Sequence, residues 1–395
     1  MKKLFTISVF SAALSLGGSP DMHATELTFA TFNVSMEAQN YLPHGEAGDG
    51  TVLAELLKTD SQPQIKNIAH IIQLVRPDVL LLNEFDYIAN PEHGIKAFIR
   101  NYLNKAQGNA LAIDYPYFYY NTVNTGQPSG FDLDNDGKAS GIGADAWGYG
   151  FYPGQYGMVL LSKYPIDTAK VRSFQQFKWK DMPGFMPTKK ADGSPWYSDA
   201  AWAQFPLSSK SHWDIPLLVN GNTIHVLASH PTPPVFDGPE NRNGIRNHDE
   251  IRFWVDYLTP DNAGYIYDDK GSKGGLAADS PFVLLGDQNA SADGEGDALN
   301  TAIRALYHHP RINNSNPPAS AGGAENAADN PNAPFHTAGW RMRADYVLPS
   351  TSGFVIKDSG VFWPAKADPL YPLVGSRGAS SDHRLVWVKL ELSAD

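Results

Sequence analysis

Polar residues that could bind a divalent cation or move a proton follow several short apolar runs of the sequence. Asn33 lies at the end of one run, Glu84 follows a second and His230 a third, while Asp287 and Asn289 follow a fourth. Carboxylate and amide oxygens are the ligands that magnesium, manganese and calcium prefer, and an imidazole near neutral pH can orient or transfer a proton. Because the loops at the ends of strands can converge, these side chains could form one site.

Three further candidates lie nearer the carboxyl end. Asp345 begins one apolar run, and the pair Asp382-His383 precedes another. Hydrolysis of a phosphoester requires a hard cation, a positioned water, a group that orients or deprotonates this water, and charge stabilisation near the leaving group. Asp345 could hold an imidazole ring in one tautomer. Each residue alone also fits an ordinary turn or surface role, so the hypothesis depends on their conjunction.

The apolar runs have the length and composition of buried strands. They cover residues 27–34, 79–82, 159–161, 223–228, 282–285, 346–348 and 385–392. Residues 64–75 carry an apolar stripe at helical spacing that Arg76-Pro77 ends, and residues 248–258 predict a second helix. Asn220-Gly221 between two apolar runs predicts an antiparallel hairpin. This mixture of helices and antiparallel strands predicts a layered α/β sandwich.

Long loops and a leader segment complete the expected organisation. Stretches rich in Gly, Pro, Asn and aromatic residues at 125–155, 178–211 and 312–338 are interpreted as insertions on one domain, residues 25–395. Residues 1–24 resemble an export signal, because two lysines precede an apolar run and small residues follow it. That run is shorter than the roughly 20 residues that span a bilayer. The sequence therefore predicts an exported protein, periplasmic or extracellular, without a transmembrane segment.

Composition limits the chemistry and the partners. The 395 residues include no cysteine, so disulfides and thiolate ligands are excluded, and a metal site must use oxygen and imidazole. The formal charge of -11 offers no overall footprint for nucleic acid, whose nonspecific binding depends on Lys and Arg. A small phosphoester is favoured over long nucleic acid, although a local basic groove or bound cations can offset a negative total. No feature predicts a protein partner.

The candidate residues lie within seven short motifs. In chain order these are Thr-Phe-Asn33-Val, Leu-Leu-Asn-Glu84, Gly157-Met-Val-Leu-Leu-Ser162-Lys-Tyr-Pro-Ile166, Ala-Ser-His230, Leu-Gly-Asp287-Gln-Asn289, Ala-Asp345-Tyr and Ser381-Asp382-His383. This ordered set resembles the endonuclease/exonuclease/phosphatase superfamily, in a secreted, bacterial-type form, from Thr28 to Leu392. The resemblance implies a four-layer α/β sandwich of the deoxyribonuclease I-like fold. Two packed mixed β-sheets would be flanked by helices, with the active site at one edge.

The resemblance also implies which residues hold a catalytic metal ion. Glu84 would be the principal ligand, assisted by Asn33 and Asp382. The expected ion is Mg²⁺ or Mn²⁺, because all three residues offer hard oxygen donors.

By the same resemblance, the other motif residues would act on the substrate. Asp287 would orient or deprotonate the attacking water, and Asn289 would bind a phosphate oxygen. His383 would contact the scissile phosphate with Asp345 behind it. His230 is similar in position to the other catalytic histidine of deoxyribonuclease-like and sphingomyelinase-like members.

The sequence departs from the family pattern after the hairpin histidine, where a long polar loop replaces an apolar strand end. Arg242, Arg246 and His248 in this region could recognise a phosphate or a polar head group, since guanidinium groups match phosphate oxygens. The alternative is that Asp249 and Glu250 cap the following helix and the arginines pair with acids.

A second cation site is predicted within the first insertion. Asp132, Asp134 and Asp136 alternate before a glycine, as in loops of the EF-hand type that wrap calcium. The position of the closing glutamate is occupied by Gly143, so Asp145 could complete the shell of a structural calcium ion instead. Without calcium, the same segment would be a flexible acidic turn.

The leading hypothesis is a secreted, divalent-metal-dependent phosphatase or phosphodiesterase. Activated water would attack a small or head-group phosphoester in line with the leaving group. The first alternative is an extracellular endonuclease or deoxyribonuclease. A noncatalytic calcium-dependent binding protein on a hydrolase fold is the third, and the presence of both Glu84 and His383 argues against it.

Overall fold

The computed structural model describes residues 25–43 and 46–393. The predicted export signal, residues 1–24, lies outside the described residues. Within the described part of the chain, no helix is long and apolar enough to cross a membrane.

One β-sheet combines the two ends of the chain with its first strands. Its six strands lie in the order β10-β11-β1-β2-β4-β3. β1 pairs in parallel with β2 and antiparallel with β11, so the sheet is mixed. The register sets Asn33 of β1 opposite Asn83 of β2, which brings the first two motifs together at one end of the sheet. The strands are β1 (Glu26–Met36), β2 (Val79–Phe85), β3 (Tyr117–Tyr119), β4 (Met158–Ser162), β10 (Phe354–Val361) and β11 (Val386–Leu392).

The second sheet contains five strands in the order β5-β6-β7-β8-β9. β7 and β8 are parallel, whereas the other neighbours are antiparallel. The predicted hairpin joins β6 to β7, and both Asn220 (φ 50°) and Gly221 (φ 88°) adopt the positive φ that such turns require. The strands are β5 (Arg172–Ser173), β6 (His212–Val219), β7 (Asn222–Ser229), β8 (Phe282–Asp287) and β9 (Asp345–Pro349).

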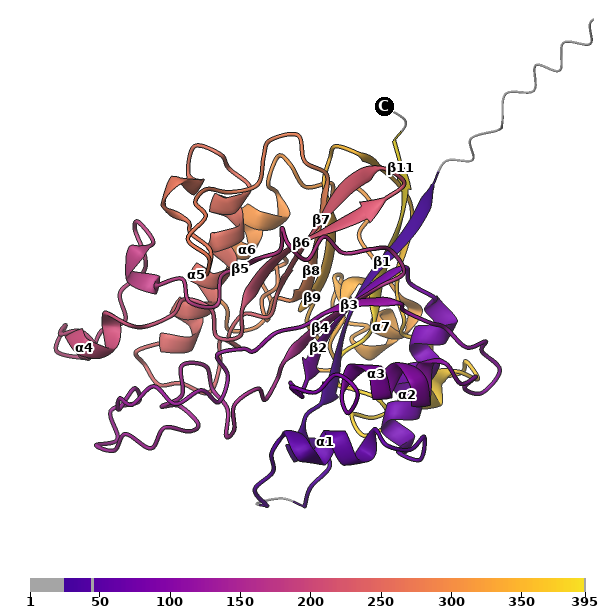
Figure 1. Ribbon diagram of the computed structural model, residues 1–395, viewed down its shortest axis with the longest axis horizontal. Helices are drawn as coiled ribbons and strands as arrows, with labels where there is room; N and C mark the ends of the chain where they lie inside the picture. The colour runs from indigo at the N-terminus through magenta and orange to yellow at the C-terminus, as the bar shows by residue number, and fades with distance from the viewer. Residues whose placement is uncertain (1–24, 44–45, 394–395) are drawn as a thin grey trace, which may run out of the picture.

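The two sheets pack face to face between layers of helices. Alternate side chains of a strand point to opposite faces, so Val226 and Val283 join the core between the sheets, while Leu227 and Leu284 pack beneath the outer helices. Figure 1 shows α5 and α6 on one side of the strands and α2 and α3 on the other. The predicted four-layer sandwich of two mixed sheets is confirmed. The helices are α1 (Gly50–Leu56), α2 (Pro63–Val75), α3 (Ile95–Phe98), α4 (Asp199–Trp202), α5 (Arg242–Tyr257), α6 (Asn300–Tyr307) and α7 (Ala321–Asn326).

Of the two helices predicted from the sequence, α2 has nearly the predicted bounds, whereas α5 starts earlier than predicted. α2 begins with Pro63 and ends before Arg76, which adopts a left-handed conformation (φ 55°), and its apolar stripe is buried. The second helix, α5, begins at Arg242 rather than at residue 248. Its first two turns bury polar side chains instead of an apolar stripe, so the periodic signal that marks a helix is absent there. Asp249 and Glu250 therefore lie inside the helix and do not cap its start.

The three stretches predicted as insertions contain little regular structure. Residues 125–155, all of them described, contain isolated β-bridges but no helix or extended strand. Gly148 packs this insertion on the second, because a Cβ there would lie 2.0 Å from the carbonyl oxygen of Ser209. The other two insertions hold α4, α7 and two 3-10 turns, η3 (Trp179–Asp181) and η5 (Ala333–Phe335). The remaining turns are η1 (Ala38–Asn40), η2 (Ile99–Leu103, a π-helical turn), η4 (Ala263–Tyr265) and η6 (Tyr371–Leu373).

Candidate active site

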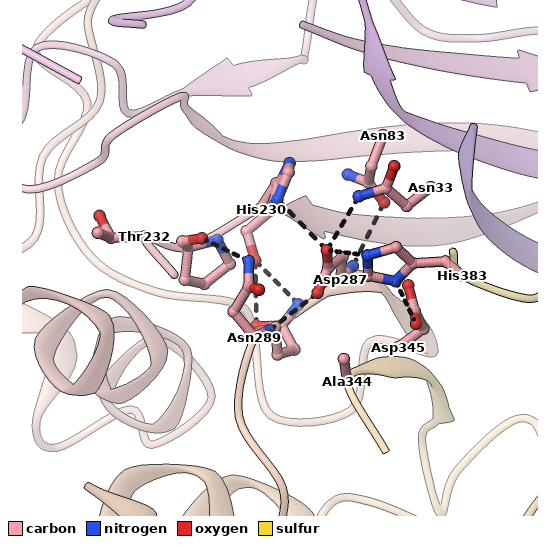
Figure 2. Close-up of polar contacts among 12 residues, drawn as sticks. Asn33, Asn83, His230, Thr232, Asp287, Asn289, Ala344, Asp345 and His383 are labelled. Atoms are coloured by element: carbon pink, nitrogen blue, oxygen red, sulfur yellow. Dashed lines mark hydrogen bonds and ion pairs between the residues drawn. The ribbon is translucent and has the colours of Figure 1, made fainter. Parts of the chain in front are cut away.

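The motif residues of the two sheets meet at one edge of the sandwich. Asn33 Nδ2 of β1 donates a hydrogen bond to Asp287 Oδ2 of β8 over 3.1 Å. Asn83 Oδ1 of β2 accepts one from the Asp287 backbone amide over 3.3 Å. Figure 2 shows both contacts, which join residues far apart in the sequence. All three side chains are buried, so these bonds fix the relative position of the sheets at this edge.

Asp287 lies at the centre of the cluster. Its Oδ2 atom lies 3.4 Å from His230 Nε2 and 3.5 Å from His383 Nε2, and its Oδ1 atom accepts a hydrogen bond from the Asn289 amide over 2.9 Å. Burial raises the pKa of Asp287, the positive charge of His383 opposes this shift, and the Asp345 carboxylate adds to it. A carboxyl group in this setting is poised to accept a proton near neutral pH.

His383 is held by a second carboxylate on the opposite side of its ring. Its Nδ1 atom lies 2.9 Å from Asp345 Oδ2, and the same oxygen accepts a hydrogen bond from Thr337 Oγ1 over 2.7 Å. The other oxygen, Asp345 Oδ1, is buried without a partner among the described residues. The Asp345–His383 contact predicted from the sequence motifs is therefore present, and it fixes Nδ1 as a donor and leaves Nε2 facing Asp287.

The two histidines experience opposite electrostatic surroundings. Burial disfavours the charged form of His383, but the Asp345 and Asp287 carboxylates outweigh it and raise its pKa. Burial lowers the pKa of His230 well below its usual value, and the positive charges of Lys210 and His383 lower it further. One buried imidazole is thus neutral and the other is cationic at the same edge of the sheet.

Glu84 and Asp382 form the acidic side of the site. Burial raises the pKa of Glu84, the charge of His383 and the Asn33 amide oppose this shift, and the Asp382 carboxylate raises it again. Asp382 accepts a hydrogen bond from Ser35 Oγ over 3.3 Å and pairs with Arg377 over 3.2 Å. Two carboxylates that repel each other beside an amide oxygen match the donor set of a hard divalent cation, so these residues fit a magnesium or manganese ion.

A second group of potential ligands overlaps the first. Asp287, Asp345 and His383 each offer a ligand atom, and these atoms all lie within 4.8 Å of one another. In the described structure, however, their facing atoms are engaged in the carboxylate–imidazole contacts given above. The fully oxygen-based set around Glu84 agrees better with the preference of magnesium for oxygen ligands.

Several backbone positions at this edge are conformationally costly. Ser35 (φ 48°), Glu84 (φ 56°) and Asn289 (φ 51°) all adopt the left-handed region that non-glycine residues seldom occupy. Such conformations cost of order 1–3 kcal/mol each and persist where surrounding contacts over-determine them. The strain coincides with the ends of β1, β2 and β8, where the motif side chains leave their strands.

Sequence reasoning missed Lys210. Its side chain is buried, and its Nζ has no hydrogen bond or ion pair with the residues that the structure describes. Burial lowers its pKa, whereas the charges of Glu250, Glu84 and Asp287 raise it, so its ammonium group belongs to the electrostatics of this site. A lysine among serines at the end of this stretch, residues 208–211, carries no local pattern that would distinguish it from a solvated one.

Polar residues of α5 position the loops around the site, and these too were missed. Glu250 accepts hydrogen bonds from the Ser209 amide over 2.5 Å and from the Thr232 amide over 2.6 Å. Asn247 Nδ2 donates to the carbonyl oxygens of Thr232 and Gln288, each over 2.9 Å. Two side chains of one helix therefore hold the backbone next to Lys210, His230 and Asn289.

The structure places Arg242, Arg246 and His248 in contacts within the fold. Arg246 is buried, and its Nε and Nη2 atoms donate to the carbonyl oxygens of Leu207 (2.9 Å) and Pro206 (3.1 Å). Arg242 pairs with Glu240, and the ring nitrogens of His248 lie 2.9 Å from Asp249 Oδ1 and 3.0 Å from Thr301 Oγ1. Only Arg242 pairs with an acid, as the structural alternative expected, whereas Arg246 binds carbonyl oxygens. Because all three side chains are engaged within the fold, we leave them out of the proposed site.

The candidate calcium loop has an acidic cluster at its centre. Ligand oxygens of Asp132, Asp134 and Asp136 lie within 4.8 Å of one another, and Asp132 Oδ1 is buried without a partner among the described residues. Asp145 does not join them, contrary to expectation. Its carboxylate instead accepts hydrogen bonds from the Leu133 amide (2.7 Å) and from the amide and hydroxyl of Ser140 (2.8 Å each), so it closes the loop through backbone contacts.

The family described as endonuclease/exonuclease/phosphatase matches residues 30–383. Among solved structures, an endonuclease/exonuclease/phosphatase from Beutenbergia cavernae is similar over 93% of this chain and 72% of its own, with 17% identity and a TM-score of 0.49. Staphylococcus aureus beta toxin with bound magnesium ions is similar over 93% and 100%, with 13% identity and a TM-score of 0.45.

A third similar structure is sphingomyelinase C from Streptomyces griseocarneus, over 92% of this chain and 99% of its own, with 14% identity and a TM-score of 0.43. No curated protein matches the sequence.

Proposed function

Because the chain belongs to the endonuclease/exonuclease/phosphatase family, we propose that it is an exported, divalent-metal-dependent hydrolase of a small or head-group phosphoester. The observation that supports this best is the buried Asp287 carboxylate, which contacts Asn33 and lies between His230 and His383. Attack by water on a phosphoester requires a proton acceptor and groups that stabilise the developing charge. The carboxylate and the two imidazoles, one cationic and one neutral, supply these at one point. Export depends on the predicted signal, residues 1–24.

In the proposed site, Glu84 is the principal ligand of Mg²⁺ or Mn²⁺, with Asn33 and Asp382 beside it. The chemistry that such an ion supplies is neutralisation of negative charge on the phosphate oxygens. Asp382 would take this role in place of its contact with Arg377, and its partly buried carboxylate also accepts a hydrogen bond from Ser35.

Asp287 is proposed to orient the attacking water and to take its proton as the water oxygen bonds to phosphorus. The bond from phosphorus to the ester oxygen breaks in the same step, and the leaving alcohol takes up a proton from solvent. Its raised pKa makes it a better base than an exposed aspartate, and the hydrogen bonds from Asn33 and from the Asn289 backbone fix the direction of its lone pairs. Asn289 Nδ2 donates to the carbonyl oxygen of Pro231 over 3.1 Å, which leaves its second N–H for a phosphate oxygen.

The two histidines are assigned different tasks. His383, kept cationic by Asp345, stabilises the charge that develops on the phosphate in the transition state. His230 is neutral, and its Nε2 faces Asp287 while its Nδ1 is buried without a partner among the described residues. A neutral ring can donate one hydrogen bond to the phosphate without adding a second positive charge to the buried site.

The substrate is proposed to be small because the chain carries a net charge of -11. Affinity for a long polyanion depends on released counterions, and this requires many cationic contacts. The alternative, an extracellular endonuclease, is supported by the presence of two site histidines. Nicking of plasmid DNA at rates comparable with those on small diesters would favour the nuclease.

The test is a panel of phosphomonoesters, phosphodiesters and plasmid DNA, each with magnesium, with manganese and with a chelator. Wild-type protein should hydrolyse at least one ester only when metal is present, and Glu84→Gln should lose most of this activity while keeping its melting temperature. Glu55→Gln, which alters an exposed carboxylate on α1, is the matched control and should remain fully active. Inactivity of the wild type on the whole panel would refute the function, and wild-type turnover in Glu84→Gln would refute the ligand assignment.

A further inference from the structure

A cavity of about 220 Å³ adjoins the candidate active site at Asp382. Its wall combines α7, the segment 363–377 before β11, and Gly339, whose amide donates to the Asp382 carbonyl oxygen over 2.7 Å. Asp382 lines the cavity, and the next residue in the chain, His383, belongs to the catalytic cluster. An occupant of the cavity would therefore lie beside one of the proposed ligands of the catalytic metal ion.

The cavity is cationic although the protein as a whole is acidic. Among the lining residues, Lys366, Arg377 and Arg384 are cationic and only Asp382 is anionic. The Glu325 carboxylate lies nearby, where it accepts a hydrogen bond from the Lys366 amide over 2.8 Å. Arg377 pairs with Asp382 over 3.2 Å, whereas Lys366 and Arg384 have no ion pair within residues 25–43 and 46–393. A concentrated positive field in a recess is the usual means of selecting an anion.

The Arg384 side chain is held in this wall by contacts within the fold. It is buried, and its guanidinium donates only to backbone carbonyl oxygens, at 2.8 Å to Ser381, 2.9 Å to His383 and 3.0 Å to Val374. Its Nε has no partner among the described residues. Carbonyl oxygens satisfy hydrogen bonds but do not neutralise the charge of a buried guanidinium. A second anion near Arg384 would offset this charge.

The aromatic side of the cavity is equally fixed. Arg384 Cζ lies 4.4 Å from the centre of the Trp363 ring, in a cation–π contact. Gly322 allows this packing, because a Cβ at that position would lie 2.2 Å from Trp363 Cδ1. Only the rim cations, Lys366 and Arg377, are exposed and free to adjust to a ligand.

We propose that this cavity binds a second anionic group, a phosphate or a carboxylate, carried by the same substrate molecule as the scissile phosphate. The inference rests on the proposed function and makes it more specific, because it selects substrates with two anionic groups. Arg384 and Trp363 would form the fixed floor, and Lys366 and Arg377 would close on the anion from the rim.

Calorimetric titration with nonhydrolysable ligands tests the proposal independently of turnover. The probes are terminal bisphosphonates from ethane to hexane, each compared with the alkylphosphonate of equal length, with and without magnesium. At the best length the bisphosphonate should bind roughly tenfold more tightly, as expected for one charge-assisted contact. The corresponding phosphonocarboxylates show whether a carboxylate or a phosphate is the preferred second group.

Two variants locate the effect. Lys366→Gln and Arg377→Gln should each remove most of the bisphosphonate advantage and leave alkylphosphonate binding unchanged. Lys366→Gln is the cleaner of the two, because Arg377 also pairs with Asp382. Arg100→Gln is the matched control, since Arg100 is similarly exposed (57% against 61% for Arg377) and pairs with an acid over 3.5 Å.

Equal affinity of the two ligand classes at every length, or an advantage that survives in both cavity variants, would overturn the inference. The outcome is separable from that of the proposed function. Hydrolysis without a bisphosphonate advantage would remove only the cavity proposal. A bisphosphonate advantage in a protein that hydrolyses no phosphoester would remove only the proposed function.

Discussion

Replacement of His383 by alanine is the sharpest test of the catalytic cluster. The ring is buried, with Asp345 at Nδ1 (2.9 Å) and Asp287 at Nε2 (3.5 Å). Removal of a positioned charge-stabilising group usually lowers turnover by about two to four orders of magnitude, equivalent to about 3–5 kcal/mol of transition-state stabilisation. We expect a loss in this range for His383→Ala, measured as initial rate on the best substrate of the panel.

Asp345→Asn should reproduce part of this loss, because an amide keeps the shape of the carboxylate but removes the charge that favours the imidazolium. Thr337 Oγ1 can still donate to the amide oxygen, so the fold should tolerate the change. Where a carboxylate behind a catalytic histidine is neutralised, losses reach about four orders of magnitude. If the two residues act as one unit, the double variant should be scarcely slower than His383→Ala alone.

The control for this cycle is a second aspartate–histidine pair away from the site. His225 Nδ1 lies 2.6 Å from Asp214 Oδ1 at the β6–β7 hairpin, and its side chain is 20% exposed. His225→Ala should therefore retain near wild-type turnover, and near-ultraviolet circular dichroism should show that all variants are folded. Full activity in His383→Ala would refute the catalytic assignment, and losses that multiply in the double variant would show that Asp345 acts independently of the ring.

Two further predictions concern stability. Calcium should raise the melting temperature, because Asp134 lies among like charges of Asp132 and Asp136 that a cation would neutralise; a rise that persists in Asp134→Ala would place the site elsewhere. Burial lowers the pKa of His212 from 6.5 to about 4, so its neutral form stabilises the fold above pH 6.5, and this contribution is lost as the pH falls toward 4. The shift corresponds to at most about 3 kcal/mol. Denaturant unfolding of His212→Gln should depend less on pH across this window, and an unchanged dependence would refute the assignment.

The layer architecture could be predicted because its signals are local. The apolar runs indicate strands, the Asn220-Gly221 pair indicates a turn and the apolar stripe of α2 indicates a helix, each within a few residues. That Asp287, Asn33, His230 and His383 share one site was implied by the family resemblance, because the order of the motifs, and not local patterning, indicates which strand ends meet. Their distances do not follow, because these depend on the strained turns at the strand ends.

The roles of cationic residues could not be predicted in the same way. A guanidinium in a polar loop matches a phosphate and a backbone carbonyl equally well, and Arg246 is engaged by carbonyls of a segment about 40 residues earlier in the chain. Arg384 and Lys210 look unremarkable in the sequence, yet both are buried. Whether a cation faces a ligand or the fold is decided by tertiary contacts that no spacing pattern encodes.

The same limitation explains why the start of α5 escaped detection. Long irregular insertions bring backbone amides into the interior, and each buried amide requires an acceptor that the insertion itself does not provide. α5 supplies these acceptors through Glu250 and Asp249, which bind amides of Ser209, Thr232 and Met186. A helix whose buried face is polar has no apolar stripe, so it resembles a surface loop in the sequence. In the undetected start of the helix, Arg246 and Asn247 are likewise buried and donate to backbone carbonyl oxygens of the neighbouring loops, so a polar segment beside long insertions is a signal of such a helix.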